Sequence, residues 1–336
     1  MKCVDLFCGV GGLSLGLKLS GIEVLAGIDA WAQALDVYRL NHEHDAIELD
    51  LSDVQAATLA IKRYDFDLIA GGPPCQDFSH AGKRVEGSRA NLTLCFASVV
   101  VQNAPQWFIM ENVDRSQNST AYTEAREIYK KAGYGLTEKV LDASLCGVPQ
   151  KRKRFFCIGK LGEKDGFLLP IIDKKLAQSP MTVRQYLGAE LNIDYYYRHP
   201  RNYSRRGVFS VDEPSATIRG VNRPVPKGYP GHANDKIAVG AVRPLTTLER
   251  ARIQTFPQDY CWRGSKTEIE QFIGNAVPAN LARFVGECVL AFMGIASKAD
   301  YPTLKRAPHK GQMQLCEPPP ITYIPKVRKV IYSKTC

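Results

Sequence analysis

Residues 2–17 read KCVDLFCGVGGLSLGL, a short apolar run followed by a glycine-rich turn and a second apolar segment. This pattern predicts a buried strand, a tight loop and a helix. A further apolar run, Ile22 to Ile28, ends in Asp29. A strand, loop, helix and strand with an acid at the tip of the second strand are typical of nucleoside-binding sheets. We therefore predict an α/β fold with a doubly wound, mostly parallel sheet.

The glycines of this stretch indicate a compact cofactor. Ser14 stands where the dinucleotide fingerprint G-x-G-x-x-G has its third glycine, so the loop does not match that motif. A backbone close to a small cofactor fits better than a pyrophosphate held at a helix terminus. Asp29 would then accept hydrogen bonds from ribose hydroxyls, and Asp50, which ends the run 46–50, could meet an adenine amino group. Alternatively, each acid caps a helix.

Residues 68–79 read LIAGGPPCQDFS, in which an apolar run meets a pair of glycines and a pair of prolines. The sequence predicts the end of a buried strand and a restricted turn that delivers Cys75 at the carboxyl end of that strand. Open α/β sheets bind their ligands at this edge. The alternative is an ordinary buried cysteine beside a tight turn, since free cysteine is among the most buried residue types.

A second ionisable group follows the apolar residues 107–110, WFIM, which lead directly to Glu111. The apolar run and the neighbouring Asn112 predict a half-buried carboxyl group with a raised pKa. We expect this group and the Cys75 thiol to lie at the same edge of the sheet and to act together. A helix cap or a surface charge is the alternative for Glu111.

A basic segment at residues 150–154, QKRKR, leads into an apolar run at 155–159. Alternation along a strand would place Arg152 and Arg154 on one face, where they suit an anionic substrate or a carbonyl oxygen. A solvated basic edge strand is the alternative.

The composition favours a polyanionic partner. The chain has 44 Lys and Arg residues against 34 Asp and Glu, which leaves a net charge of +10. Residues 180–240 are rich in Arg, Tyr, Gly and Pro and lack a sustained helical period, which predicts a smaller second domain that approaches nucleic acid. Its arginines suit guanine edges in the major groove. A merely solvated basic surface is the alternative.

Taken in order, these motifs resemble those of bacterial DNA (cytosine-5)-methyltransferases of the restriction-modification type. The combination of Pro-Cys-Gln and Glu-Asn-Val in this order is the most specific part of the resemblance. The matching residues are 5–12, Asp29, Asp50, 72–76, 111–113, 150–154, 243–246 and 274–278. The resemblance implies a class I, Rossmann-like methyltransferase fold, a double-stranded DNA substrate and a flipped-out cytosine. It implies no metal.

The same resemblance implies that S-adenosylmethionine is the cofactor. The residues expected to bind it are Phe7, Gly9, Gly11, Gly12, Asp29, Asp50, Pro74 and Asn275. One position departs from the family pattern. Several relatives have a Trp directly after the ribose acid, whereas here Ala30 follows Asp29 and the aromatic residue is Trp31.

The resemblance also implies the chemistry. The Cys75 thiolate adds to carbon 6 of cytosine, which makes carbon 5 able to take the methyl group. Glu111, kept near neutrality by burial, donates a proton to ring nitrogen 3. Arg154 would hold the carbonyl at carbon 2, while Arg152 would help to orient Glu111 or the thiol.

We expect the chain to be divided into a catalytic and cofactor-binding domain, a target-recognition domain, a return to the catalytic domain and a basic, proline-rich tail. Their bounds are 1–175, 176–265, 266–296 and 297–336. The recognition domain includes a junction helix at 246–257, which Thr246 and Glu249 open as a capping box. In this domain Thr217 and Ile218 resemble the family's Thr-Leu core. The expected DNA-binding residues are Arg201, Arg205, Arg206, Thr217, Ile218 and Arg219.

Further expectations concern the surroundings of the protein. The chain has no apolar run of membrane-spanning length, no signal peptide and no Cys-x-x-Cys pair among its ten cysteines, which favours a reduced cytoplasm. The resemblance implies that this cytoplasm is bacterial or belongs to a phage host. We expect a monomer with a linked restriction endonuclease as its functional partner. Two alternatives stay open: a tRNA cytosine-5 methyltransferase of the same architecture, and a catalytically inactive DNA-binding module. The intact Cys75 and Glu111 argue against the inactive module.

Overall fold

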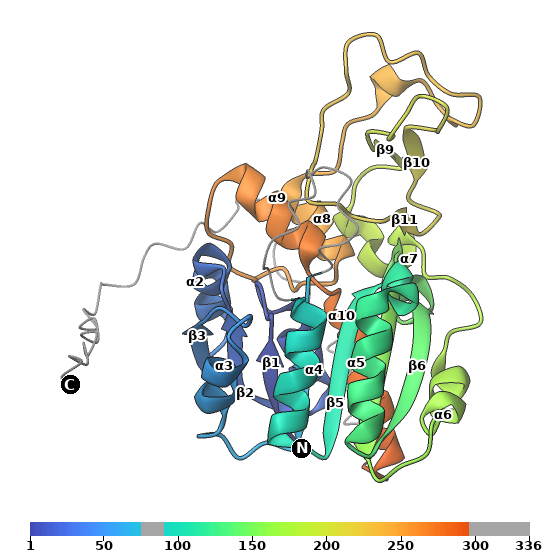
Figure 1. Cartoon of the computed structure of the whole chain (residues 1–336). Helices are drawn as coiled ribbons and strands as arrows, with labels where there is room; N and C mark the ends of the chain where they lie inside the picture. Colours follow the sequence, from blue (N-terminus) through green and yellow to red (C-terminus); the bar gives the residue numbers. More distant parts are fainter. Residues whose placement is uncertain (75–90, 296–336) are drawn as a thin grey trace, which may run out of the picture.

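The computed structural model describes residues 1–74 and 91–295, which are built around a seven-stranded sheet (Figure 1). The strand order is β3-β2-β1-β4-β5-β8-β6. The strands are β1 (Lys2–Leu6), β2 (Glu23–Asp29), β3 (Asp45–Glu48), β4 (Leu68–Gly71), β5 (Trp107–Val113), β6 (Tyr134–Asp142) and β8 (Lys153–Leu161). The chain order reverses between β1 and β4, so the carboxyl ends of these two strands flank the crevice where such sheets bind ligands.

The sheet is parallel from β3 to β5, which confirms the predicted mostly parallel, doubly wound arrangement. The exception is β8, which runs antiparallel between β5 and β6. In its register Val113 of β5 lies opposite Arg154 of β8. The antiparallel strand therefore brings the basic segment to the same edge of the sheet as Glu111.

Helices cover both faces of the sheet, as the alternation of buried side chains along its strands requires. On β5, Trp107 and Ile109 share an apolar cluster with α1 (Gly12–Ser20) and α10 (Ala279–Phe292). Phe108 and Met110 belong to the cluster on the other face, which Figure 1 shows covered by α3, α4 and α5. The further helices of this layered part are α2 (Ala32–Asn41), α3 (Val54–Ile61), α4 (Leu92–Asn103), α5 (Thr120–Lys131) and α6 (Leu169–Lys175).

Close packing of α1 on α10 joins the two ends of the described chain. A Cβ atom at Gly16 would overlap the carbonyl oxygen of Ala279 and the side chain of Ala282, so only glycine permits this approach. The N-cap of α10 is Pro278 and its C-cap is Met293, so the helix begins directly after the 274–278 motif.

A second region lies beyond the end of the sheet opposite the N-terminus (Figure 1). Its elements are α7 (Val183–Leu187), β9 (Tyr195–Tyr197), β10 (Val208–Ser210), β11 (Ser215–Ala216), α8 (Thr247–Ile253) and α9 (Lys266–Asn275). The strands β9 and β10 form an antiparallel pair, while β11 pairs with β7 (Gln150–Lys151). The predicted capping box is confirmed, because Thr246 and Glu249 bond each other's backbone at the start of α8.

The two regions share an apolar cluster in which Val10 and Ala34, from the sheet side, pack with Ile218 and Phe272. The expected domain boundaries after residues 175, 265 and 296 therefore stay a prediction. The tail at 297–336 lies outside the described residues. Within the described part of the chain, no helix is both long and apolar enough to cross a bilayer.

Candidate active site

The glycine-rich loop after β1 is held in an unusual backbone conformation. Phe7 has a φ of 60°, Gly9 of 53° and Gly11 of 89°. Positive φ is costly for a residue with a side chain, and such strain concentrates at ligand sites. The N–H of Gly9 donates to Asp29 Oδ2 at 2.8 Å, which ties the loop to the tip of β2.

A cavity of about 420 Å³ opens at the carboxyl ends of β1, β2, β4 and β5. The structure thus brings together most of the predicted catalytic and cofactor-binding residues of the described chain. Those that line the cavity are Phe7, Gly9, Gly12, Asp29, Pro74, Glu111, Arg152, Arg154 and Asn275. Cys75 lies outside the described residues, directly after Pro74.

Two predicted cofactor residues do not line this cavity. Asp50 is exposed and its carboxylate accepts the N–H of Ser52 at 2.9 Å, a contact that lowers the pKa of Asp50. The strand β3 ends at Glu48, so Asp50 falls in the turn before α3, whose N-cap is Asp53. Gly11 has a packing role instead, because a Cβ there would overlap the ring of His42.

Asp29 is held as a carboxylate acceptor. Its Oδ1 accepts the N–H of Trp31 at 2.9 Å, while its Oδ2 accepts from Gly9. Burial raises the pKa of Asp29, and these backbone donors oppose that rise. Neither bond goes to a residue inside α2, so Asp29 does not cap that helix.

Aromatic side chains form one wall of the cavity. Trp31, one position later than in the family pattern, lines it and packs edge-on against Phe272 with ring centroids 4.8 Å apart. Phe272 was missed by the sequence prediction. Its position two residues before the 274–278 motif was the available signal, since aromatic residues near a nucleoside site are natural stacking partners.

Glu111, which also lines the cavity, is 7% exposed and lies in the buried part of β5. Arg154 Nε lies 2.9 Å from Glu111 Oε1. Burial raises the pKa of Glu111, as predicted, while the charges of Arg154 and Arg152 lower it. Gly72 leaves room for the carboxylate, because a Cβ there would lie 3.1 Å from Oε2.

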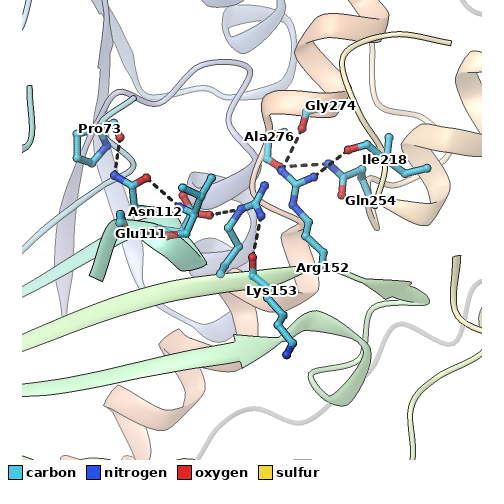
Figure 2. A network of polar contacts seen from close by, with 12 residues as sticks. Pro73, Glu111, Asn112, Arg152, Lys153, Ile218, Gln254, Gly274 and Ala276 are labelled. Carbon is cyan, nitrogen blue, oxygen red and sulfur yellow. Dashed lines mark hydrogen bonds and ion pairs between the residues drawn. The ribbon is translucent and has the colours of Figure 1, made fainter. Parts of the chain in front are cut away.

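Asn112 fixes the turn that leads to Cys75. Its side-chain amide donates to the carbonyl oxygen of Pro73 at 3.0 Å, and the residue is 4% exposed (Figure 2). The bond links β5 to the turn after β4. A buried hydrogen bond of this kind restrains the backbone just before the predicted nucleophile.

The hydrogen bonds of Arg152 do not go to Glu111, one of its two predicted partners; the other, the Cys75 thiol, lies outside the described residues. Its guanidinium group donates to three backbone carbonyls, those of Ile218 at 3.0 Å, Gly274 at 3.0 Å and Ala276 at 3.1 Å (Figure 2). It forms no hydrogen bond to Glu111 in the described structure. The side chain is 1% exposed, and burial lowers the pKa of this guanidinium well below its ordinary value. Arg152 therefore joins segments that are distant in sequence.

The predicted DNA-binding residues surround two adjoining hollows of about 320 Å³ and 520 Å³ in the second region. Several of these residues are held by ion pairs, hydrogen bonds or burial within the protein. Arg206 pairs with Glu213 at 2.5 Å, Arg219 donates to His199 O at 2.9 Å, and Ile218 is buried. The Thr217 hydroxyl donates to Lys151 O at 2.7 Å.

Two other arginines differ in their surroundings. Arg201 and Arg205 are exposed, and neither side chain forms a hydrogen bond or ion pair with another described residue. Arg201 lines both hollows. Within residues 1–74 and 91–295, no group of three His, Cys, Asp or Glu side chains could hold a metal ion.

Comparison with known proteins agrees with this geometry. Residues 1–291 match the family model described as C-5 cytosine-specific DNA methylase. The Type II methyltransferase M.HindV of Haemophilus influenzae is 53% identical over 87% of this chain and 97% of its own length. M.HgiDI of Herpetosiphon aurantiacus is 52% identical over 87% of this chain and 95% of its own.

Among solved structures, the S. pombe Dnmt2 methyltransferase superposes with a TM-score of 0.65 at 20% identity, over 88% of this chain and 99% of the other. At that identity the likeness concerns the fold alone. The family model spans nearly all the described residues. The chain therefore belongs to the C-5 cytosine-specific DNA methylases.

Proposed function

We propose that this protein transfers a methyl group from S-adenosylmethionine to carbon 5 of a flipped-out cytosine in double-stranded DNA. The observation that carries the proposal is the shared cavity, whose lining includes both Asp29 with its neighbouring aromatic rings and the Glu111–Arg154 pair. Its relatives with 52–53% identity are named Type II methyltransferases, which supports a role in protecting host DNA beside a restriction endonuclease.

The cavity suits S-adenosylmethionine in size and chemistry. Small-molecule sites are roughly 300–1,000 Å³, mostly apolar, with a few placed polar groups. Phe7 and Trp31 supply flat surfaces for an adenine, and the Asp29 oxygens keep lone pairs for ribose hydroxyls. Among the described residues outside Gly9 and its chain neighbours, no heavy atom lies within 4 Å of a Cβ built at Gly9, so this part of the chain leaves open space beside the loop.

In the proposed mechanism the Cys75 thiolate adds to carbon 6 of the cytosine, and Glu111 gives a proton to ring nitrogen 3. Carbon 5 thereby becomes nucleophilic. When bound, S-adenosylmethionine supplies the methyl group. A base then takes the carbon 5 proton, the Cys75 thiolate is expelled, and the proton on ring nitrogen 3 returns to Glu111, which completes the exchange. In this mechanism Arg154 holds the cytosine carbonyl and keeps Glu111 oriented, a role that its ion pair with Glu111 supports.

For DNA recognition we propose two different roles for the residues around the two hollows. Arg201 and Arg205, which are exposed and unpaired among the described residues, contact DNA directly. Arg206, Thr217 and Arg219, which form an ion pair or hydrogen bonds within the protein, shape the surface that carries Arg201 and Arg205. The proposal extends to a monomeric protein in the bacterial or phage-infected cytoplasm.

The test is methyl transfer with labelled S-adenosylmethionine and either plasmid DNA or tRNA. We expect label in plasmid DNA, and bisulfite sequencing should locate it at cytosines of one recurring sequence. Label found in tRNA and absent from DNA would replace the proposal with the tRNA alternative. Label in neither would favour a DNA-binding module without activity.

A further inference from the structure

The main chain of Ile218 is held on both sides by side chains of the basic segment. Its N–H donates to Gln150 Oε1 at 2.8 Å, and its carbonyl accepts from Arg152 Nη1 at 3.0 Å. Ile218 stands between Thr217 and Arg219, which border the hollows of the recognition region. A shift of residues 217–219 on DNA binding would therefore change the hydrogen bonds that Gln150 and Arg152 form with Ile218.

The same two side chains lead to the wall of the cofactor cavity. Arg152 Nη2 donates to the carbonyls of Gly274 and Ala276 at 3.0 and 3.1 Å. Gln150 Nε2 donates to Gln254 Oε1 at 2.7 Å, and Gln254 Nε2 donates onward to Ala276 O at 3.1 Å. Two parallel routes thus connect Ile218 with residues 274–276, all of which line the cavity. Figure 2 labels the residues of the route through Arg152.

The connection is buried and tightly packed. Gln150 and Gln254 are fully buried and Arg152 is 1% exposed, so water cannot replace a bond that breaks. The two segments also touch directly, because a Cβ at Gly274 would overlap the backbone of Gly220. Because such a contact has no free space, a displacement of Gly220 would also displace Gly274.

We infer that Gln150, Arg152 and Gln254 form a junction that makes target recognition and cofactor binding energetically dependent on each other. They act as positioning residues, which set segment 274–276 according to the state of segment 217–219. By linkage, target DNA then tightens cofactor binding by the factor by which cofactor tightens target binding. The inference rests on the proposed function.

The experiment measures the dissociation constant of S-adenosylhomocysteine for the free protein and for the protein saturated with duplex DNA. One duplex carries the sequence located by bisulfite sequencing, and a second has that sequence scrambled. For the wild type we expect the target duplex to tighten binding by a factor within the usual range of roughly 5–150, with a factor near one for the scrambled duplex. Arg152→Met and Gln254→Met should each bring the target factor close to one.

Arg252→Met is the matched control. Arg252 is also a buried arginine, 7% exposed, and it donates to the carbonyl of Phe256, four residues away. Its loss should destabilise the fold while leaving the target factor at the wild-type value. If Arg152→Met fails to fold by circular dichroism, Gln254→Met decides the test, since it leaves the Arg152 charge in place.

The inference is overturned if both junction variants keep the wild-type factor, or if Arg252→Met loses as much as they do. A wild-type protein that methylates plasmid DNA but shows no tightening also overturns it and leaves the proposed function intact. A protein that methylates no DNA overturns both. The methylation assay is therefore run first, on the wild type.

Discussion

A buried acid under the glycine loop gives a stability prediction that the structure makes quantitative. Asp5 of β1 is fully buried, and its Oδ2 accepts the hydroxyl of Ser14 at 2.6 Å. Its Oδ1 has no hydrogen-bond partner among the described residues. Burial raises the pKa of Asp5 from 3.8 to about 7, against the opposing effect of the Ser14 hydroxyl.

The sign follows from proton linkage. A raised pKa means that the folded protein binds the proton more tightly than the unfolded chain, so stability falls as the pH rises from about 4 to about 7. Between about pH 4.5 and pH 7.5 the loss of unfolding free energy from this one group is ~3 kcal/mol. Asp5→Asn mimics the neutral acid and should therefore be more stable than the wild type at pH 7.5, with a much smaller advantage at pH 4.5.

Urea unfolding of both proteins at these two pH values measures the effect. His42, whose pKa burial lowers to about 3, acts in the opposite direction: its contribution weakens as the pH falls below 6.5. Because His42 is common to both proteins, its effect cancels in their difference. Equal pH dependence of wild type and Asp5→Asn would refute the argument that Asp5 is protonated in the fold near neutrality.

The remaining predictions concern the chemistry and the recognition of DNA. Glu111→Gln should slow methyl transfer by roughly 10² or more in single-turnover assays, because an amide cannot supply the proton to ring nitrogen 3; lost DNA binding with unchanged turnover per complex would make Glu111 structural. Cys75→Ser should lose transfer yet keep binding S-adenosylhomocysteine, and only the wild type should form a covalent adduct with DNA that carries 5-fluorocytosine. A serine variant with substantial turnover would disprove the covalent route. Arg201→Ala should cost roughly 1–3 kcal/mol in target binding and relax one position of the methylated sequence if it reads a base, or lower the salt dependence alone if it contacts a phosphate. Bisulfite sequencing and binding at several salt concentrations separate these, and an unchanged site and salt slope would place recognition elsewhere.

Much of the fold follows from local signals. The apolar runs that end at Asp29 and Glu111 are strands because several buried residues in succession suit a sheet covered on both faces. The capping box at Thr246 is likewise local. The direction and neighbours of β8 could not be predicted, since alternation within residues 153–161 indicates a strand without saying which strands it joins.

In the active site, too, some features follow from local sequence and others depend on contacts between distant residues. The motifs predict that Glu111 and Arg154 share a site, and both line the cavity; their pairing follows once β8 lies beside β5. The hydrogen bonds of Arg152 could not be predicted, because its partners Ile218 and Gly274 are distant in the chain and no local pattern encodes such bonds. Asp50 was placed on the assumption that its strand continued to that residue, whereas β3 ends at Glu48.

The packing of α1 on α10 also has a consequence for synthesis. Leu13 and Leu17 of α1 are covered in part by Leu281 and Val285 of α10, which the ribosome adds last among the described helices. At the usual 5–20 residues per second, roughly 10–50 s pass between the two helices. During that interval the nascent chain carries an uncovered apolar sheet face that chaperones can bind. Translation of an mRNA that is truncated before the codons of α10 should therefore give an aggregation-prone fragment instead of a smaller active enzyme.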